Sequence, residues 1–197
     1  MSWQFTSFMI PLVAAALTSA TLAIFAWRRR PGPGVGPLVI LLITVSAWSV
    51  MYILELGAAR LPDKVFWINM QYFCITAIPP IWLVFILAYT RHQRWLTRRY
   101  LLPLLIEPLL VIALVWTNDQ HGLFRSNIAL LETGTASPIV TSDLGVGFWV
   151  HAVYSYTLLL AGTALLLRTM IRAPQLYRGQ TFALLLGTAA PWLGNAI

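Results

Sequence analysis

Six long apolar runs dominate this sequence, and they constrain its fold more than any other feature. Each is close to the length of about 20 mostly apolar residues that an α-helix needs to cross the hydrocarbon core of a bilayer. The runs cover residues 5–27, 37–57, 65–90, 100–117, 146–168 and 181–197. The sequence therefore predicts an all-α membrane protein, a helical bundle of six transmembrane spans in which residues 1–197 form a single domain.

The composition indicates that a bilayer, rather than water, surrounds this chain. Hydrophobic residues make up 59% of it and charged residues 10%, with a mean hydropathy of +0.76, whereas soluble domains carry about a quarter charged residues. The net charge of +7 comes from basic residues in short clusters between the apolar runs. They form no continuous stripe, so we expect the lipid bilayer, and no nucleic acid, as a partner.

The basic residues also predict the orientation of the spans. Cytoplasmic loops carry an excess of lysine and arginine, and here alternate loops hold ten basic residues against three. The ten are Arg28, Arg29, Arg30, Arg91, Arg94, Arg98, Arg99, Arg168, Arg172 and Arg178, and the three are Arg60, Lys64 and Arg125. We therefore expect a multi-pass protein of the bacterial cytoplasmic (inner) membrane with its amino terminus outside.

The loop 118–145 is much longer than the others and lies on the predicted outer side. It contains two β-prone stretches, 123–131 and 139–142, separated by Thr133-Gly134-Thr135, a pattern that predicts a small hairpin. A hairpin over the outer mouth of the bundle is suited to act as a lid or to contact a ligand. A tolerated insertion without such a role is the other interpretation.

Glu107 is expected near the centre of the membrane, because it lies five to seven residues inside the fourth span. An isolated carboxylate there costs about 2.5–3.5 kcal/mol on insertion scales, so it should face the bundle interior and be protonated or paired. The next residue, Pro108, lacks an N–H group and leaves a carbonyl one turn earlier without its helical donor. This kinked, polar midpoint is either a hinge or a structural contact between helices.

Most other polar residues of the spans fall in the predicted outer half and share helix faces. Trp48, Tyr52 and Glu55 share one face, and so do His151 and Tyr154, by their spacing of three and four residues. The candidate ligand-binding residues are Trp48, Tyr52, Glu55, Trp67, Gln71, Glu107, His151, Tyr154 and Asn195. One interpretation is an outward-opening cavity for a small molecule, with Glu55 and His151 as its ionisable pair. The other is a set of interhelical hydrogen bonds, worth about 0.6 kcal/mol each.

The sequence lacks the motifs of common catalytic sites. It contains no His-Glu-x-x-His zinc motif and no glycine-rich nucleotide loop, and its one cysteine, Cys74, lies in an apolar run. The only lysine, Lys64, is expected in the link 58–64 outside the spans, so no span offers an amine for a retinal Schiff base. We therefore expect no catalytic residue, metal or cofactor in this chain.

Two further classes of membrane protein stay open on this sequence. Prolines interrupt two spans, at Pro79-Pro80 and at Pro108, as in transporters with broken helices. A small multi-span transporter or channel is therefore the alternative to a receptor. A purely structural membrane subunit is the third.

A series of short elements gives the chain a resemblance to a known family. They are Ala47-Trp48 and Glu55; Phe66-Trp67 and Gln71-Tyr72; Pro79-Pro80, Trp82, Phe85 and Tyr89; Trp95-Leu96-Thr97-Arg98 and Pro108; Thr117-Asn118 and His121-Gly122-Leu123-Phe124; Phe148-Trp149, His151, Tyr154 and Tyr156; Pro174, Tyr177-Arg178, Gln180, Gly187, Pro191 and Asn195. In their order and spacing, over about residues 38–195, the chain resembles the amino-terminal seven-transmembrane region of bacterial histidine kinases.

This resemblance implies a seven-helix sensor that passes the signal of an unidentified small ligand to a cytoplasmic output module, most often a histidine kinase. It also implies a homodimer. The sequence stops inside the sixth span, so we expect the seventh span and the output module beyond Ile197. The positions that match the family by analogy are Glu55, Trp67, Gln71, His151, Tyr154 and Asn195.

Overall fold

The structure, a computed structural model, describes residues 4–29, 32–131 and 138–172. Within these residues, five helical segments are long and apolar enough to cross a membrane. They are α1 (Met9–Arg28), α2 (Val35–Gly57), α3 (Leu61–Tyr89), the segment Arg98–Trp116, and α7 (Val146–Arg172). The predicted all-α membrane fold is thus confirmed for five spans, and the predicted sixth span, 181–197, lies outside the described residues.

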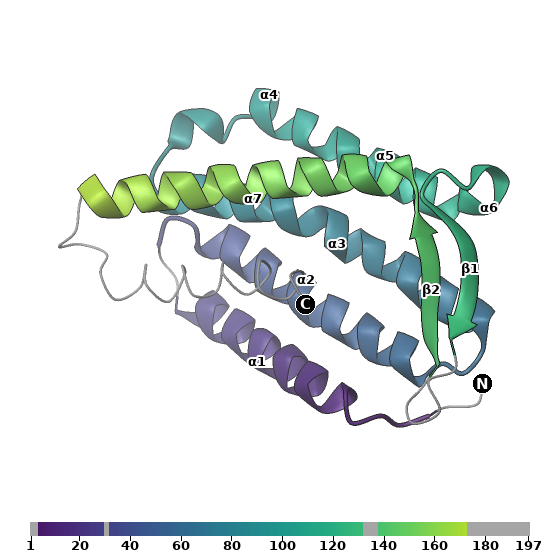
Figure 1. The fold of residues 1–197 in the computed structure, drawn as a ribbon. Helices are drawn as coiled ribbons and strands as arrows, with labels where there is room; N and C mark the ends of the chain where they lie inside the picture. The colour runs from purple at the N-terminus through teal and green to yellow at the C-terminus, as the bar shows by residue number, and fades with distance from the viewer. Residues whose placement is uncertain (1–3, 30–31, 132–137, 173–197) are drawn as a thin grey trace.

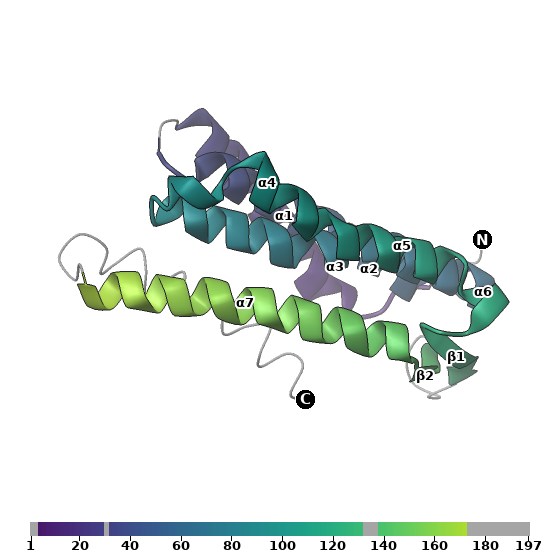
Figure 2. The ribbon, with the colours of Figure 1, turned by 90° about the horizontal axis from the view of Figure 1, so that it is seen from above.

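The long helices run side by side, and α3 lies at the centre of the bundle (Figure 1). It packs against α2 on one side and against α5 and α7 on the other, whereas α1 packs along α2. A view from above shows α7 and the α4–α5 segment as separate rods beside α3 (Figure 2). We call the end of the bundle with the β-strands the hairpin end, which is the predicted outer side. The opposite end, with Arg28, Arg91 and Arg98, is the arginine end.

The third span starts earlier than its apolar run predicts. Helix α3 begins at Leu61 rather than at residue 65, because Pro62 fits a first helical turn and Asp63 complements the amino-terminal end of the helix dipole. Lys64 therefore belongs to the first turn of α3. The prediction that it lies in a link between spans is wrong.

The fourth span is interrupted by a 3₁₀ turn that contains Pro103 and ends three residues before Pro108. It consists of α4 (Arg98–Leu101), a 3₁₀ turn η2 (Leu102–Leu105) and α5 (Ile106–Trp116). A short 3₁₀ turn, η1 (Gln93–Trp95), precedes it. By contrast, α3 continues as one helix through Pro79 and Pro80.

The long loop forms the predicted hairpin. A short helix α6 (Asn118–His121) leads into β1 (Arg125–Leu131), which pairs antiparallel with β2 (Ile139–Leu144). Asn118 holds the start of β1: its Oδ1 accepts hydrogen bonds from the Phe124 and Arg125 N–H groups, and its Nδ2 donates to the Arg125 carbonyl at 2.8 Å. The hairpin is therefore attached to the end of the fourth span by buried hydrogen bonds.

Two clusters of buried side chains join the central helix to its neighbours. The cluster near the hairpin end consists of Tyr72, Val111, Val115 and Phe124, and the one near the arginine end of Trp82, Phe85, Ile86 and Leu166. Many large apolar side chains on α1, α2 and α7 are exposed instead. Exposed apolar surface on this scale is what lipid contact requires.

Candidate functional site

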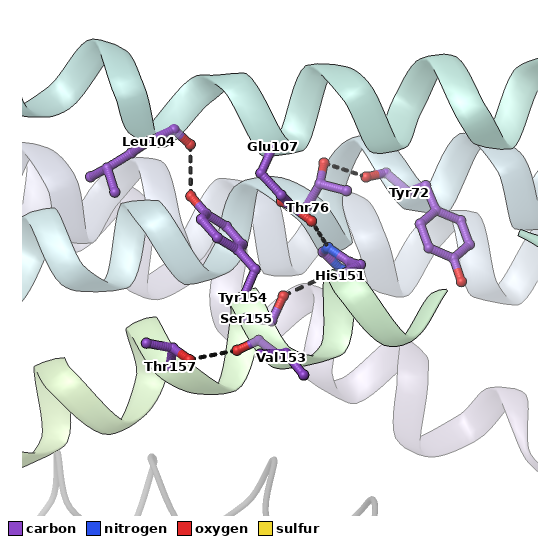
Figure 3. A network of polar contacts seen from close by, with 9 residues as sticks. All are labelled: Tyr72, Thr76, Leu104, Glu107, His151, Val153, Tyr154, Ser155 and Thr157. Carbon is purple, nitrogen blue, oxygen red and sulfur yellow. Dashed lines mark hydrogen bonds and ion pairs between the residues drawn. The ribbon is translucent and has the colours of Figure 1, made fainter. Parts of the chain in front are cut away.

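The buried carboxylate of the fourth span pairs with a histidine of α7. Glu107 Oε1 lies 2.8 Å from His151 Nδ1, and the two side chains are 15% and 6% exposed. The other ring nitrogen of His151, Nε2, lies 3.3 Å from Ser155 Oγ (Figure 3). The prediction that Glu107 faces the bundle interior with a partner is confirmed. We call Glu107 and His151 the central pair.

A second contact lies one helical turn from the central pair. The Tyr154 hydroxyl donates a hydrogen bond of 2.7 Å to the Leu104 carbonyl (Figure 3). Leu104 is four residues before Pro108, so its carbonyl is the one that a regular helix would pair with the N–H that proline lacks. The sequence predicts that this carbonyl needs a partner, and Tyr154 of α7 supplies it.

The central pair leaves one polar atom unsatisfied. Glu107 Oε2 is buried, and among the described residues it has no hydrogen-bond partner. A buried acceptor without a donor costs about 1–3 kcal/mol. A change in the distance between Glu107 and His151 therefore changes the energy of the helix packing.

Three of the candidate residues form a hydrogen-bonded network between α2 and α3. Gln71 Nε2 donates to Glu55 Oε2 at 2.5 Å, and Trp48 Nε1 donates to Gln71 Oε1 at 3.0 Å. We call Trp48, Glu55 and Gln71 the α2–α3 network. Since interhelical hydrogen bonds in membrane proteins contribute about 0.6 kcal/mol each, the network favours one packing of the two helices.

Lys64 lies close to this network at the hairpin end. Its side chain is 1% exposed, and Nζ donates a hydrogen bond of 2.9 Å to the Glu55 carbonyl. The buried ammonium therefore holds the end of α2 against the first turn of α3. The apolar run starts after Lys64, so it does not indicate that this lysine is buried. Pro62 and Asp63, which precede Lys64, are the signal for an earlier start of the helix.

Arg125, the first residue of β1, connects the hairpin with the spans. It is 6% exposed, and its Nη2 donates to Asn69 Oδ1 of α3. Its guanidinium lies 5.6 Å from the ring centroid of Tyr72. Burial lowers the pKa of Arg125, while Tyr72, Glu55 and Asp119 act to raise it, and an arginine side chain keeps its charge in any case.

Tyr72 joins the hairpin to the central pair. Its ring packs edge-on against Phe124, with 5.0 Å between ring centroids, and makes a second edge contact with the His151 ring at 6.4 Å between centroids. A continuous series of contacts thus runs from Arg125 over Tyr72 to His151 and Glu107. Polar groups at the hairpin end and at the middle of the fourth span are therefore in physical contact through a single aromatic side chain.

The sequence of this bundle matches a known protein family. The family model for the N-terminal 7TM region of histidine kinase matches residues 11–197. The chain belongs to this family. It is a multi-pass membrane sensor region of histidine kinases, and not itself the catalytic part. No curated protein and no solved structure matches the chain.

The 7TM region brings its candidate residues together in two groups rather than in one. Trp48, Glu55 and Gln71 form the α2–α3 network, whereas Glu107, His151 and Tyr154 meet at the break of the fourth span. The predicted pairing of Glu55 with His151 is wrong, because α3 lies between α2 and α7 and each residue finds a nearer partner. Depth along the membrane indicated where these residues lie but not which helices are neighbours.

Two further candidates that the structure describes, Tyr52 and Trp67, belong to neither hydrogen-bonded group. Tyr52 is 39% exposed on α2. Trp67 is partly buried and its ring packs edge-on against Phe66 at 5.2 Å. Asn195 lies outside the described residues.

The described part of the 7TM region contains apolar cavities. One of about 330 Å³ lies between α2, α3 and the fourth span, and another of about 690 Å³ lies between α1 and α2. Neither of these is lined by any of the eight candidate residues that the structure describes. Among the described residues, no group of three or more His, Cys, Asp or Glu side chains could hold a metal ion.

Proposed function

We propose that this region is the sensor of a histidine kinase of the bacterial inner membrane, and that it detects an extracellular or membrane-soluble small ligand. Residues 1–197 belong to one transmembrane sensory domain, and the protein acts as a homodimer with a cytoplasmic kinase module in the same chain. Membership in the family supports the sensor role. The ligand, the dimer and the module are our extension of it.

The observation that carries the proposal is the contact series from the hairpin to the broken span. Arg125 of the hairpin contacts Tyr72, and Tyr72 contacts His151, the partner of Glu107. A ligand that moves the hairpin, or that replaces a hydrogen bond of the α2–α3 network, acts on this series. Such a ligand would shift the equilibrium between two packings of the bundle only as far as it binds one packing more tightly than the other.

The break of the fourth span supplies the element that responds. A regular helix resists changes in its hydrogen bonds, but the segment at Leu104 and Pro108 depends on Tyr154 of α7 for one of them. Motion of α7 relative to this break would therefore be transmitted to the arginine end. That end is the predicted cytoplasmic side, where an output module would receive it.

The test measures phosphate transfer from ATP to a histidine in the full-length protein, reconstituted in vesicles. Gln71→Leu removes both hydrogen bonds of the α2–α3 network, so we expect the rate of phosphohistidine formation to change roughly fivefold, because about 1 kcal/mol of preference between packings is lost. Val50→Leu, at an exposed position of the neighbouring helix α2, is the control and should leave the rate unchanged.

Three results would count against the proposal. Absence of phosphohistidine in the parent protein removes the kinase output. Equal rates in the parent and in a normally inserted Gln71→Leu variant remove the role of the network. Flux of a solute through proteoliposomes without any phosphorylation would favour the transporter or channel instead.

A further inference from the structure

The cavity of about 330 Å³ has a wall chemistry that fits a hydrocarbon chain. On α3 it is lined by one helix face, which includes Phe73, Thr76, Ala77 and Pro80. The only polar side chain in its lining, Thr76, is already engaged, since its hydroxyl donates a hydrogen bond of 2.7 Å to the Tyr72 carbonyl. An occupant of this cavity would therefore find no free hydrogen-bond partner and must be apolar.

The cavity lies within spans that cross the hydrocarbon region, towards the arginine end. Its lining on the fourth span starts at Leu101, in the first turn after the basic loop, and continues through Leu104 to Ile112. On α3 the lining ends with Val84, five residues before the end of the helix. Acyl chains of lipids are the apolar molecules present at this depth.

Two arginines lie at the arginine end, just beyond the residues that line the cavity. Arg98 lies one turn before Leu101 on α4, and Arg91 lies two residues past the end of α3. Both side chains are exposed. The stretch 91–106 holds four arginines and no acidic residue, so its positive charge suits an anionic group in the headgroup layer.

We propose that this cavity binds one acyl chain of an anionic phospholipid whose phosphate is held by Arg91 and Arg98. Guanidinium groups bind phosphate oxygens through paired hydrogen bonds, and the apolar wall takes the chain that the headgroup carries. The site is distinct from the polar groups of the proposed ligand response. The inference therefore stands or falls independently of the proposed function.

A lipid in this cavity touches the broken segment of the fourth span. Leu104 and Pro108 both line the cavity, and Leu104 is also the acceptor for Tyr154 on α7. The acyl chain thus packs against the turn whose geometry depends on α7. Loss of the lipid would leave that turn without contacts on one side.

The experiment measures how much lipid the full-length protein retains in a mild detergent, by native mass spectrometry. The two probes are phosphatidylglycerol and phosphatidylcholine with identical chains, each added at the same concentration. We expect phosphatidylglycerol to be preferred roughly 25-fold, because each arginine near an anionic headgroup contributes about a fivefold preference. Equal retention of the two lipids by the parent protein would overturn the proposal.

Two pairs of variants locate the site. Arg91→Gln with Arg98→Gln should abolish the preference, whereas Arg94→Gln with Arg99→Gln, the same charge change in the same stretch, should preserve most of it. Ala77→Phe should fill the cavity and lower retention several-fold, whereas Ala113→Phe, on an exposed position of α5, should not. If the two variants of either pair changed lipid retention equally, the proposal would be overturned. The same result is expected if another segment of the chain, rather than a lipid, fills the cavity.

Discussion

The Tyr154 hydroxyl donates a hydrogen bond of 2.7 Å to the Leu104 carbonyl and so replaces the N–H donor that Pro108 lacks. This hydrogen bond connects α7 with the point where Pro108 leaves a carbonyl of the fourth span without its helical hydrogen bond. The break is therefore a contact between two spans, and its stability depends on how α7 is positioned.

Tyr154→Phe should lower the free energy of unfolding by about 1 kcal/mol, because the partly buried Leu104 carbonyl loses its donor. The measurement is reversible unfolding in mixed micelles. Tyr100→Phe is the matched control, since the Tyr100 ring packs on Trp95 at 4.8 Å and the side chain is 45% exposed.

Pro108→Ala provides the decisive background for this hydrogen bond. Alanine restores an N–H that can pair with the Leu104 carbonyl, so Tyr154→Phe should then cost close to nothing. A double-mutant cycle should give a coupling of about 1 kcal/mol. If Tyr154→Phe costs the same in both backgrounds, the hydroxyl does not replace the missing donor.

His151→Ala should lower the free energy of unfolding by about 3 kcal/mol, because it leaves the Glu107 carboxylate buried without its partner. The double variant Glu107→Leu with His151→Leu should regain most of that loss, since apolar side chains of similar volume often replace a buried ion pair without cost. A double variant as unstable as His151→Ala would show that the pair itself supports the packing.

Asn118→Ala should release the start of the hairpin. Its side chain makes three hydrogen bonds to the backbone of Phe124 and Arg125, so we expect the amide hydrogens of both residues to exchange at least about tenfold faster, for a loss of about 2 kcal/mol. Thr141→Val removes an exposed side-chain hydrogen bond of the same hairpin, to the Ala129 carbonyl, and serves as the control. Unchanged exchange in Asn118→Ala would contradict the attachment.

Gly162→Ala tests the close approach of α7 to α3. A methyl group at residue 162 would lie 2.6 Å from Trp82 Nε1, so the helices must separate, at a cost of about 1–3 kcal/mol. The same substitution at Gly36 on α2 meets no atom within 4 Å and should be neutral or stabilising by up to about 1 kcal/mol. Equal unfolding free energies for the two variants would mean that α7 does not pack as described.

The features that follow from local chemistry were predictable from the sequence. Run length predicts the five described spans, turn residues predict the hairpin, and Pro108 predicts the carbonyl that needs a partner. The burial and pairing of Glu107 followed from the cost of a lone carboxylate in hydrocarbon.

The features that depend on helix neighbours were not predictable in this way. Helical rise places Glu55 and His151 at similar depth, but depth does not reveal that α3 separates them. Arg125 and Lys64 were assigned to outer loops because a charge count treats basic residues as solvated. Their burial depends on tertiary partners, Asn69 and the Glu55 carbonyl, that no local pattern indicates.

The central claim is that Tyr72 links the hairpin to the broken span and thereby sets the geometry of the arginine end. Spin labels are attached at Tyr100→Cys and Leu167→Cys, both exposed positions near that end, in a Cys74→Ala background. Pulsed electron paramagnetic resonance then reports the distance between the fourth span and α7. Tyr72→Leu should change the populations of the measured distances, whereas Val50→Leu, at an exposed position of α2, should not. An identical distance distribution in the parent and in a folded Tyr72→Leu variant would contradict the account.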